Sequence, residues 1–328
     1  MFNRLRQLGE QFLGLTPPPR AVVANLENTI APVSPRVLVI IHNPPVERYN
    51  GRRLHEIYRW PDPQQLVPQY IADLRTASFG YLNYQVVATE FADWHPPKVD
   101  GFQYTNESFM EAWQAKKHHE PNAIDYHAQL RNHRLIERVN ANEFDEVWFF
   151  AHPFNGDYES TMVGPGAFWC NSPPVADTGD CNRKFVMMAF NYERGVDCML
   201  ENYGHRTESI MTRVYERLGR GEDMWQRFIR YELTAPGRAE VGNVHFAPNS
   251  LRDYDWGNKT PVRSFADDWK TYPNLPGNAR TMDCGEWGNG DMRGHHMWWF
   301  QHIPHIEGET DGVLNNWWAY VVDPNLVP

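Results

Sequence analysis

Residues 202–208, Asn-Tyr-Gly-His-Arg-Thr-Glu, contain a histidine and a glutamate whose spacing is suited to metal binding. His205 and Glu208 lie three residues apart, so on a helix they are neighbours on one face. Apolar residues recur at helical spacing over residues 195–219, which predicts that helix. Glu201 falls on the same face, away from the apolar stripe. Histidine and carboxylate side chains are zinc ligands, although such a face can also be a solvated polar surface.

A glycine in the middle of this helix, Gly204, is unfavourable by about 1 kcal/mol relative to alanine. It predicts that another backbone segment approaches the polar face closely. The C-terminal third holds histidines that could come with that segment, namely His245 between apolar residues and four more at 295, 296, 302 and 305. We predict a zinc site with three main ligands, and with His302 or His305 as a further candidate. The three main ligands are His205, Glu208 and His245.

A second polar set follows the predicted strands. Ligands of open α/β sheets bind beyond the carboxyl ends of the strands, and each predicted strand here ends in ionisable or amide side chains. The candidate substrate-binding residues are His42, Asn43, Asp93, Asn191, Trp298 and Trp317. The candidate catalytic residues are Glu193, His152 and Glu159, with Glu193 or His152 as the general acid or base. His205 lies about 16 Å along a helix from Arg194, which predicts two polar centres or one centre and one structural cluster.

The stretch around His152, "FFAHPFNGDYES", resembles the strand and Ala-His-Pro signature of zinc-dependent de-N-acetylases. The match comprises Ala151, His152, Pro153 and the later acidic residues. The paired aspartates that directly follow the proline in that signature are missing, and the motif lies in mid-chain. The resemblance therefore assigns no family.

The elements that must position these side chains alternate along the chain. Continuous apolar runs predict strands at 36–41, 84–92, 145–153 and 183–193. Helical spacing predicts helices at 63–77, 106–117, 122–144 and 195–219, and 315–324 is predicted as a last strand. This alternation predicts a doubly wound, mostly parallel α/β sheet, wrapped by an aromatic, loop-rich C-terminal region. The predicted parts are 1–35 (an amphipathic helix and a proline-rich linker), 36–220 (the α/β domain) and 221–328 (the covering region).

Composition and charge argue against several classes of protein. The chain of 328 residues has a net charge of −10 and no basic run longer than two residues, which argues against nucleic acid as a partner. No stretch approaches 18 apolar residues, so no transmembrane helix is expected. The first 20 residues lack the apolar core of a signal peptide, so the location stays open between the cytoplasm and export with a leader removed. Four cysteines do not make a disulfide scaffold, although Cys170 and Cys181 could close a loop.

Aromatic residues make up 14% of the chain, and the 13 tryptophans are suited to stacking on sugar rings or to a large aromatic core. Together these features predict a metal-assisted hydrolase of a glycan or another large polar polymer, with its site beyond the sheet's carboxyl ends and under the C-terminal region. One alternative is a metal-free glycosidase that uses Glu193 and a second acid such as Glu159, Glu286 or Asp255. The other is a non-catalytic carbohydrate-binding or structural protein.

Overall fold

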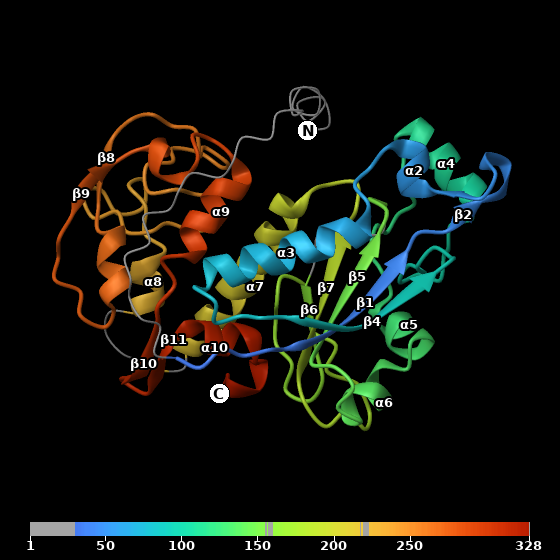
Figure 1. The fold of residues 1–328 in the computed structure, drawn as a ribbon, viewed down its shortest axis with the longest axis horizontal. Helices are drawn as coiled ribbons and strands as arrows, with labels where there is room; N and C mark the ends of the chain where they lie inside the picture. The colour runs from blue at the N-terminus through green and yellow to red at the C-terminus, as the bar shows by residue number, and fades with distance from the viewer. Residues whose placement is uncertain (1–29, 155, 157–159, 217, 219–222, 328) are drawn as a thin grey trace.

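A five-stranded sheet lies at the centre of the fold, with the strand order β4-β1-β5-β7-β6 (Figure 1). The computed structural model describes residues 30–154, 156, 160–216, 218 and 223–327 of the chain. The strands of the sheet are β1 (Arg36–His42), β4 (Gln85–Ala92), β5 (Glu146–Ala151), β6 (Ser160–Val163) and β7 (Phe185–Asn191). β1, β4, β5 and β7 run parallel, and β6 runs antiparallel to β7 at one edge. The prediction of an α/β chain with a mostly parallel sheet is confirmed.

The inner strands are buried on both faces because they are almost wholly apolar. In β1, Val37, Val39 and Ile41 enter one hydrophobic core. Leu38 and Ile40 enter the other. This alternation follows from the two-residue period of a strand, and it gives the sheet two faces that helices must cover.

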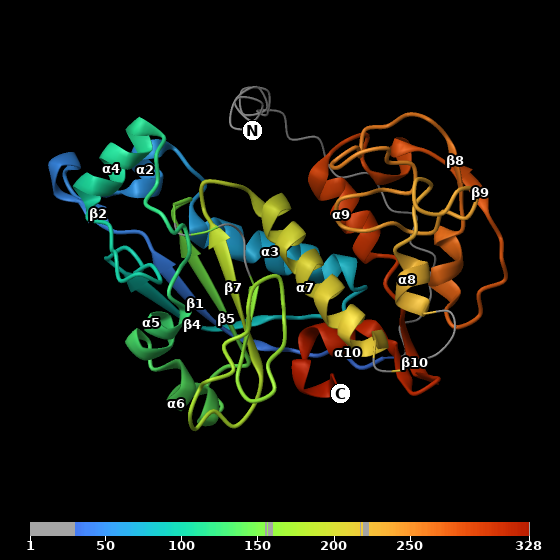
Figure 2. The same ribbon diagram turned by 180° about the vertical axis from the view of Figure 1, so that it is seen from behind.

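Helices cover both faces of the sheet, as Figure 1 and Figure 2 show from opposite sides. On one face lie α3 (Pro63–Ala77) and α7 (Val196–Glu216). On the other lie α5 (Tyr126–Asn132) and α6 (Leu135–Asn140). α7 is the longest of these helices, and its apolar side packs into the first core.

A small third cluster covers the carboxyl ends of the parallel strands. Its elements are β2 (Pro45–Val46), η1 (Glu47–Tyr49), β3 (Arg52–Arg53), α2 (Leu54–Tyr58) and α4 (Asn106–Ala115). Its core contains Val46, which follows β1, and Phe154, which follows β5. Side chains of α2 and α4 complete that core, so this cluster lies where the site was expected under the C-terminal region.

The C-terminal region packs against α7 and α3 and not over the strand ends. Its elements are α8 (Met224–Phe228), β8 (Val262–Ser264), η2 (Ala266–Thr271), β9 (Arg280–Met282), η3 (Cys284–Trp287), α9 (Met292–Phe300), β10 (His305–Thr310), β11 (Val313–Asn316), α10 (Trp317–Val322) and η4 (Pro324–Leu326). The prediction of a last strand over 315–324 is wrong beyond Asn316. Trp317, Trp318 and Val321 are fully buried, and a helical turn directs all three into the core.

Most of the tryptophans belong to the interior of the molecule. Trp225, Trp269, Trp299 and Trp317 are almost completely buried and pack against one another and against Phe228. Aromatic pairs at these spacings contribute to stability beyond the area that they bury. The high tryptophan content is therefore largely a property of the core.

Three further expectations from the sequence concern the cysteines, a membrane-spanning helix and the N-terminal segment. All four cysteines are buried free thiols, so no bridge joins Cys170 to Cys181. Among the residues that the structure describes, no helix combines the length and the apolar character needed to cross a bilayer. Most of the helix and linker predicted over 1–35 lies outside the described residues.

A buried ion pair joins α7 to the sheet. Nη1 of Arg206 lies 2.7 Å from Oε1 of Glu146, with side chains that are 0% and 3% exposed. Tyr84 and Trp148 donate hydrogen bonds to the two oxygens of the same carboxylate, at 3.2 and 2.7 Å. Nε of Arg206 donates to the backbone oxygen of Val321 at 3.1 Å, which ties α10 to the same point. One charge pair therefore connects β5, α7 and the C-terminal region.

We predict that Arg206→Leu lowers the free energy of unfolding by about 3–5 kcal/mol, because it leaves Glu146 buried without a counter-charge. Urea denaturation followed by far-UV circular dichroism measures this change. Arg131→Leu is the control, since Arg131 pairs with Asp125 at 3.7 Å and is 68% exposed. The control is expected to cost less than about 1 kcal/mol. Equal losses in both variants would contradict the prediction.

Candidate metal centre

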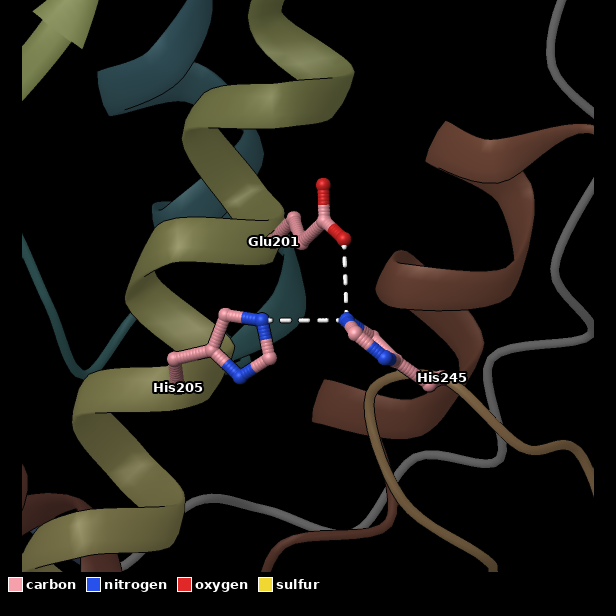
Figure 3. Close-up of side chains that lie close together, drawn as sticks. All are labelled: Glu201, His205 and His245. Atoms are coloured by element: carbon pink, nitrogen blue, oxygen red, sulfur yellow. Dashed lines mark hydrogen bonds and ion pairs between the residues drawn. The ribbon is translucent and has the colours of Figure 1, made fainter. Parts of the chain in front are cut away.

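One face of α7 carries side chains that can hold a metal ion. Glu201 and His205 lie one turn apart on this face, and His245 reaches them from the loop that follows α8 (Figure 3). Nε2 of His245 lies 3.1 Å from Nε2 of His205 and 3.1 Å from Oε1 of Glu201. One ligand atom from each residue lies within 4.8 Å of the other two. Three donor atoms this close together are suited to one metal ion.

Carboxylates hold the other nitrogen of each imidazole. Nδ1 of His205 donates to Oε2 of Glu208 at 3.0 Å, and Nδ1 of His245 forms an ion pair with Oδ1 of Asp253 at 2.9 Å. Because a carboxylate only accepts, the hydrogen bond to Glu208 places a proton on Nδ1 of His205, and the neutral form of that ring presents its Nε2 lone pair to the centre. Nε2 of His245, which hydrogen-bonds to Glu201, presents a lone pair once its proton has left. Metal-binding histidines are usually oriented by such carboxylates. Glu201, His205 and His245 are therefore candidate metal ligands, and Glu208 and Asp253 contact the two imidazoles from the other side.

The cluster favours a positive charge at its centre. Burial lowers the pKa of His245, but the hydrogen bond to Glu201 and the charges of the surrounding carboxylates raise it above its ordinary value overall. Burial raises the pKa of Glu201, but the hydrogen bond from His245 and other neighbouring donors lower it overall. A proton and a metal cation are therefore drawn to the same place.

Gly204 lets the loop that carries His245 approach α7. A Cβ atom at this position would lie 2.5 Å from Cγ2 of Val244, whose side chain is fully buried. The backbone N–H of Val244 donates to Oε1 of Glu208 at 3.1 Å, which fixes the loop to the same helix face. The close approach predicted from this glycine is present.

Two of the three predicted ligands, His205 and His245, are brought together by the fold. Glu208 contacts Nδ1 of His205, and Glu201 is the carboxylate that converges with the two histidines. The sequence signal for Glu201 is its spacing of four residues from His205, which places both side chains on one helix face. No local signal marks Asp253, because it becomes a neighbour of His245 only through the folding of the loop.

The further candidates from the histidine-rich segment have other partners. His302 is buried and donates from Nδ1 to the backbone oxygen of Trp298 at 2.7 Å. His305 stacks on Phe79, with ring centroids 4.4 Å apart. Within the described part of the chain, neither joins the cluster on α7.

The polar residues at the strand ends hold loops together. His42 is fully buried, and its Nδ1 donates to a backbone carbonyl oxygen at 3.1 Å. The side-chain amide of Asn43 donates to Nδ1 of His55 at 2.6 Å. Asp93 forms an ion pair with Arg53 at 2.7 Å and is largely exposed. These contacts join the segments after β1 and β4 to the small cluster.

The candidate catalytic residues differ in their surroundings. His152 is fully buried with its ring 4.0 Å from that of Phe109, and burial holds its pKa well below the ordinary value. Glu193 is partly exposed, and burial raises its pKa against the smaller opposite effect of Arg194. Glu159 lies outside the described residues.

The remaining substrate-binding candidates lie apart from α7's polar face. Asn191 donates from its amide to the backbone oxygen of Gly156 at 3.1 Å, and Trp298 and Trp317 are buried. His205 is the tenth residue of α7, so it lies about 14 Å along the axis from the start of the helix. The strand-end set and the cluster on α7 are therefore two separate polar centres.

The chain matches no family model, no curated protein and no solved structure. Function has to follow from the side chains themselves. The cluster on α7 is the only group of His, Cys, Asp and Glu among the described residues whose donor atoms converge in this way.

Gly204→Ala is expected to lower the free energy of unfolding by about 1–3 kcal/mol, because the new methyl group meets the stiff side chain of Val244. The helix propensity of alanine alone would predict a gain of about 1 kcal/mol. Urea denaturation of Gly204→Ala, Val244→Ala and the double variant measures the coupling. The double variant should be more stable than the sum of the two single losses. A stable Gly204→Ala protein would show that the loop does not pack here.

Buried neutral histidines are expected to make the protein unstable in mild acid. Burial lowers the pKa of His42 to about 3 and those of His95 and His296 to about 4. A depressed pKa contributes stability that is present above the unfolded value of about 6.5 and lost as the pH falls toward the folded value. The free energy of unfolding should therefore fall between about pH 6.5 and pH 4, by about 1.4 kcal/mol per pH unit for each proton taken up.

This slope can be assigned by urea denaturation at several pH values in that window. His42→Gln should have a slope that is smaller by about one proton. Parallel curves for His42→Gln and wild type would rule out the buried His42 as a source.

Proposed function

We propose that the protein is a metal-dependent hydrolase, with zinc as the expected ion, held by Glu201, His205 and His245. Two histidines and one carboxylate are a donor set of catalytic zinc sites, which leave one coordination position open. The observation that carries the proposal is the convergence of one ligand atom each from Glu201, His205 and His245, with Nδ1 of both imidazoles held by Glu208 and Asp253.

The chain's own residues would bind and orient the reacting groups. A bound zinc ion would polarise a substrate carbonyl or lower the pKa of water. Glu208 and Asp253 keep both imidazoles in the tautomer that binds through Nε2. The Arg206–Glu146 pair and Val244 fix the two segments that carry the ligands.

The proposed substrate is a glycan or another large polar polymer. The support for a large substrate is the accessibility of the cluster, since the side chains of His205 and His245 are 24% and 27% exposed. A centre at the surface of a helix can be reached by a polymer, whereas an enclosed cavity selects small molecules. Trp298 and Trp317 are buried, which does not support their stacking on a sugar.

A metal-free glycosidase centred on Glu193 is the second candidate. Burial raises the pKa of Glu193, which is a property of general acids in glycoside hydrolysis. A second carboxylate is required, and Glu286 is already engaged by Arg280 at 2.7 Å. Glu159 lies outside the described residues, so Asp255 is the remaining second acid for Glu193.

The metal content of protein purified without a histidine tag tests the proposal directly. Wild type is expected to hold about one zinc or other transition-metal ion per chain. His205→Ala and Glu201→Gln should lose it, because each removes one of three ligands. His118→Ala is the matched control, since this histidine pairs with Glu120 far from α7 in the sequence. Well-folded wild type that binds no metal even after zinc is added would overturn the metal centre.

Activity on a panel of glycans and other polar polymers separates the candidates. A chelator should abolish hydrolysis, zinc should restore it, and Glu201→Gln should lower kcat/KM by about 100-fold or more. Glu193→Gln should retain activity if the metal centre is the site. Loss of activity in Glu193→Gln alone supports the glycosidase, and binding without turnover in every variant supports a non-catalytic protein.

A further inference from the structure

Tyr254 places a fourth oxygen or nitrogen donor against the cluster on α7. Its phenol oxygen lies 2.9 Å from Oε1 of Glu201 and 3.1 Å from Nε2 of His245. It therefore contacts two of the three ligand atoms, and it contacts them at the atoms that face the centre. In a metal-free protein its O–H donates to Glu201.

Four of the six separations among these atoms are close to those of ligands around one ion. Ligands about 2.0–2.1 Å from a tetrahedral zinc ion lie about 3.3 Å from one another. Three of the separations in this cluster are 3.1 Å, namely His245 to His205, His245 to Glu201 and His245 to Tyr254. The fourth, from Tyr254 to Glu201, is 2.9 Å. The phenol oxygen thus lies as close to the donor atoms of Glu201 and His245 as Nε2 of His245 lies to those of Glu201 and His205.

The backbone also directs Tyr254 toward the cluster. Its φ of 57° lies in the left-handed region, which is rare for a bulky residue and has an energetic cost. The backbone N–H of Tyr254 donates to the carbonyl oxygen of His245 at 3.2 Å. The preceding residue, Asp253, is the carboxylate that orients His245. One short loop therefore carries both a support for a ligand and the phenol itself.

We propose that Tyr254 is a fourth protein ligand of the metal ion. The inference rests on the metal centre proposed above and adds a residue to it. Coordination forms a bond between the phenol oxygen and the ion, and the phenolic proton passes to bulk solvent. Zinc sites can expand to five ligands during catalysis, so this ligand is compatible with a hydrolytic centre. The ring is 49% exposed, so solvent and substrate can reach it.

Copper(II) and zinc(II) titrations of chelator-treated full-length protein test the proposal without any assay of activity. Copper(II) bound by Tyr254 is expected to give a phenolate-to-metal charge-transfer band in the visible range. Tyr254→Phe keeps the ring that packs on His245 and Trp256 but removes the oxygen. That variant should lose the band and bind zinc about 10- to 100-fold more weakly. Tyr231→Phe, at a tyrosine stacked on Phe246, should behave as wild type.

The outcomes separate this inference from the metal centre. A band that persists in Tyr254→Phe, or zinc affinity equal to that of wild type, overturns the role of Tyr254 while the three-ligand centre stands. Tight metal binding by wild type without the band also overturns the role of Tyr254 and leaves the three-ligand centre in place. No binding of either metal by folded wild type overturns both proposals. Thermal melting of each metal-free variant establishes that it is folded.

Discussion

The ion pair between Arg206 and Glu146 fixes the rotation of α7, and the candidate metal centre depends on that rotation. Arg206 points into the first core, where the carboxylate of β5 meets it at 2.7 Å. Neighbouring residues of a helix are separated by about 100°, so His205 and Glu201 must then point away from the sheet. Buried ion pairs add little net stability compared with apolar side chains of similar size. We infer that this pair acts mainly by specifying the orientation of the helix.

The outward face of α7 is in turn completed by a loop that has little regular structure of its own. Val244 contacts the helix at Gly204, and its backbone N–H donates to Glu208, which also accepts from His205. Glu208 therefore positions a ligand on the helix and holds the loop that carries the next one. The polar groups are desolvated together, and each finds a partner in another, which limits the cost of their burial.

The helices and strands with a regular pattern of apolar residues could be predicted from the sequence. The strand over Arg36–His42 was predictable because continuous β-branched residues are buried on both faces. The helix over 122–144 was predicted as one element, but the chain forms α5 and α6, with Arg134 at a φ of 52° between them. β6 has only four residues and no periodicity that could reveal it. Tertiary packing decides where such elements begin and end, and the local preferences of the residues carry no information about that packing.

The candidate site could likewise be predicted only where its residues follow a regular spacing. Helical spacing placed Glu201, His205 and Glu208 on one face, but it cannot tell which carboxylate is the ligand and which the support. That distinction depends on where His245 arrives. Asp253 is near in sequence to His245, yet its contact with Nδ1 requires a loop conformation that no local pattern encodes. The tryptophans were ambiguous for a different reason, because stacking on sugars and packing in a core select the same side chain.

The partners of the imidazole nitrogens distinguish the centre on α7 from the polar residues at the strand ends. At the strand ends, ring nitrogens such as Nδ1 of His42 donate to backbone oxygens, so these imidazoles join segments and stay neutral through burial. On α7 Nδ1 of both imidazoles contacts a carboxylate, and the Nε2 atoms of His205 and His245 lie 3.1 Å apart beside Glu201. A proton between these two nitrogens satisfies both of them, and a metal ion would take its place. The surrounding carboxylates favour a positive charge at this point, which is compatible with the metal centre proposed above.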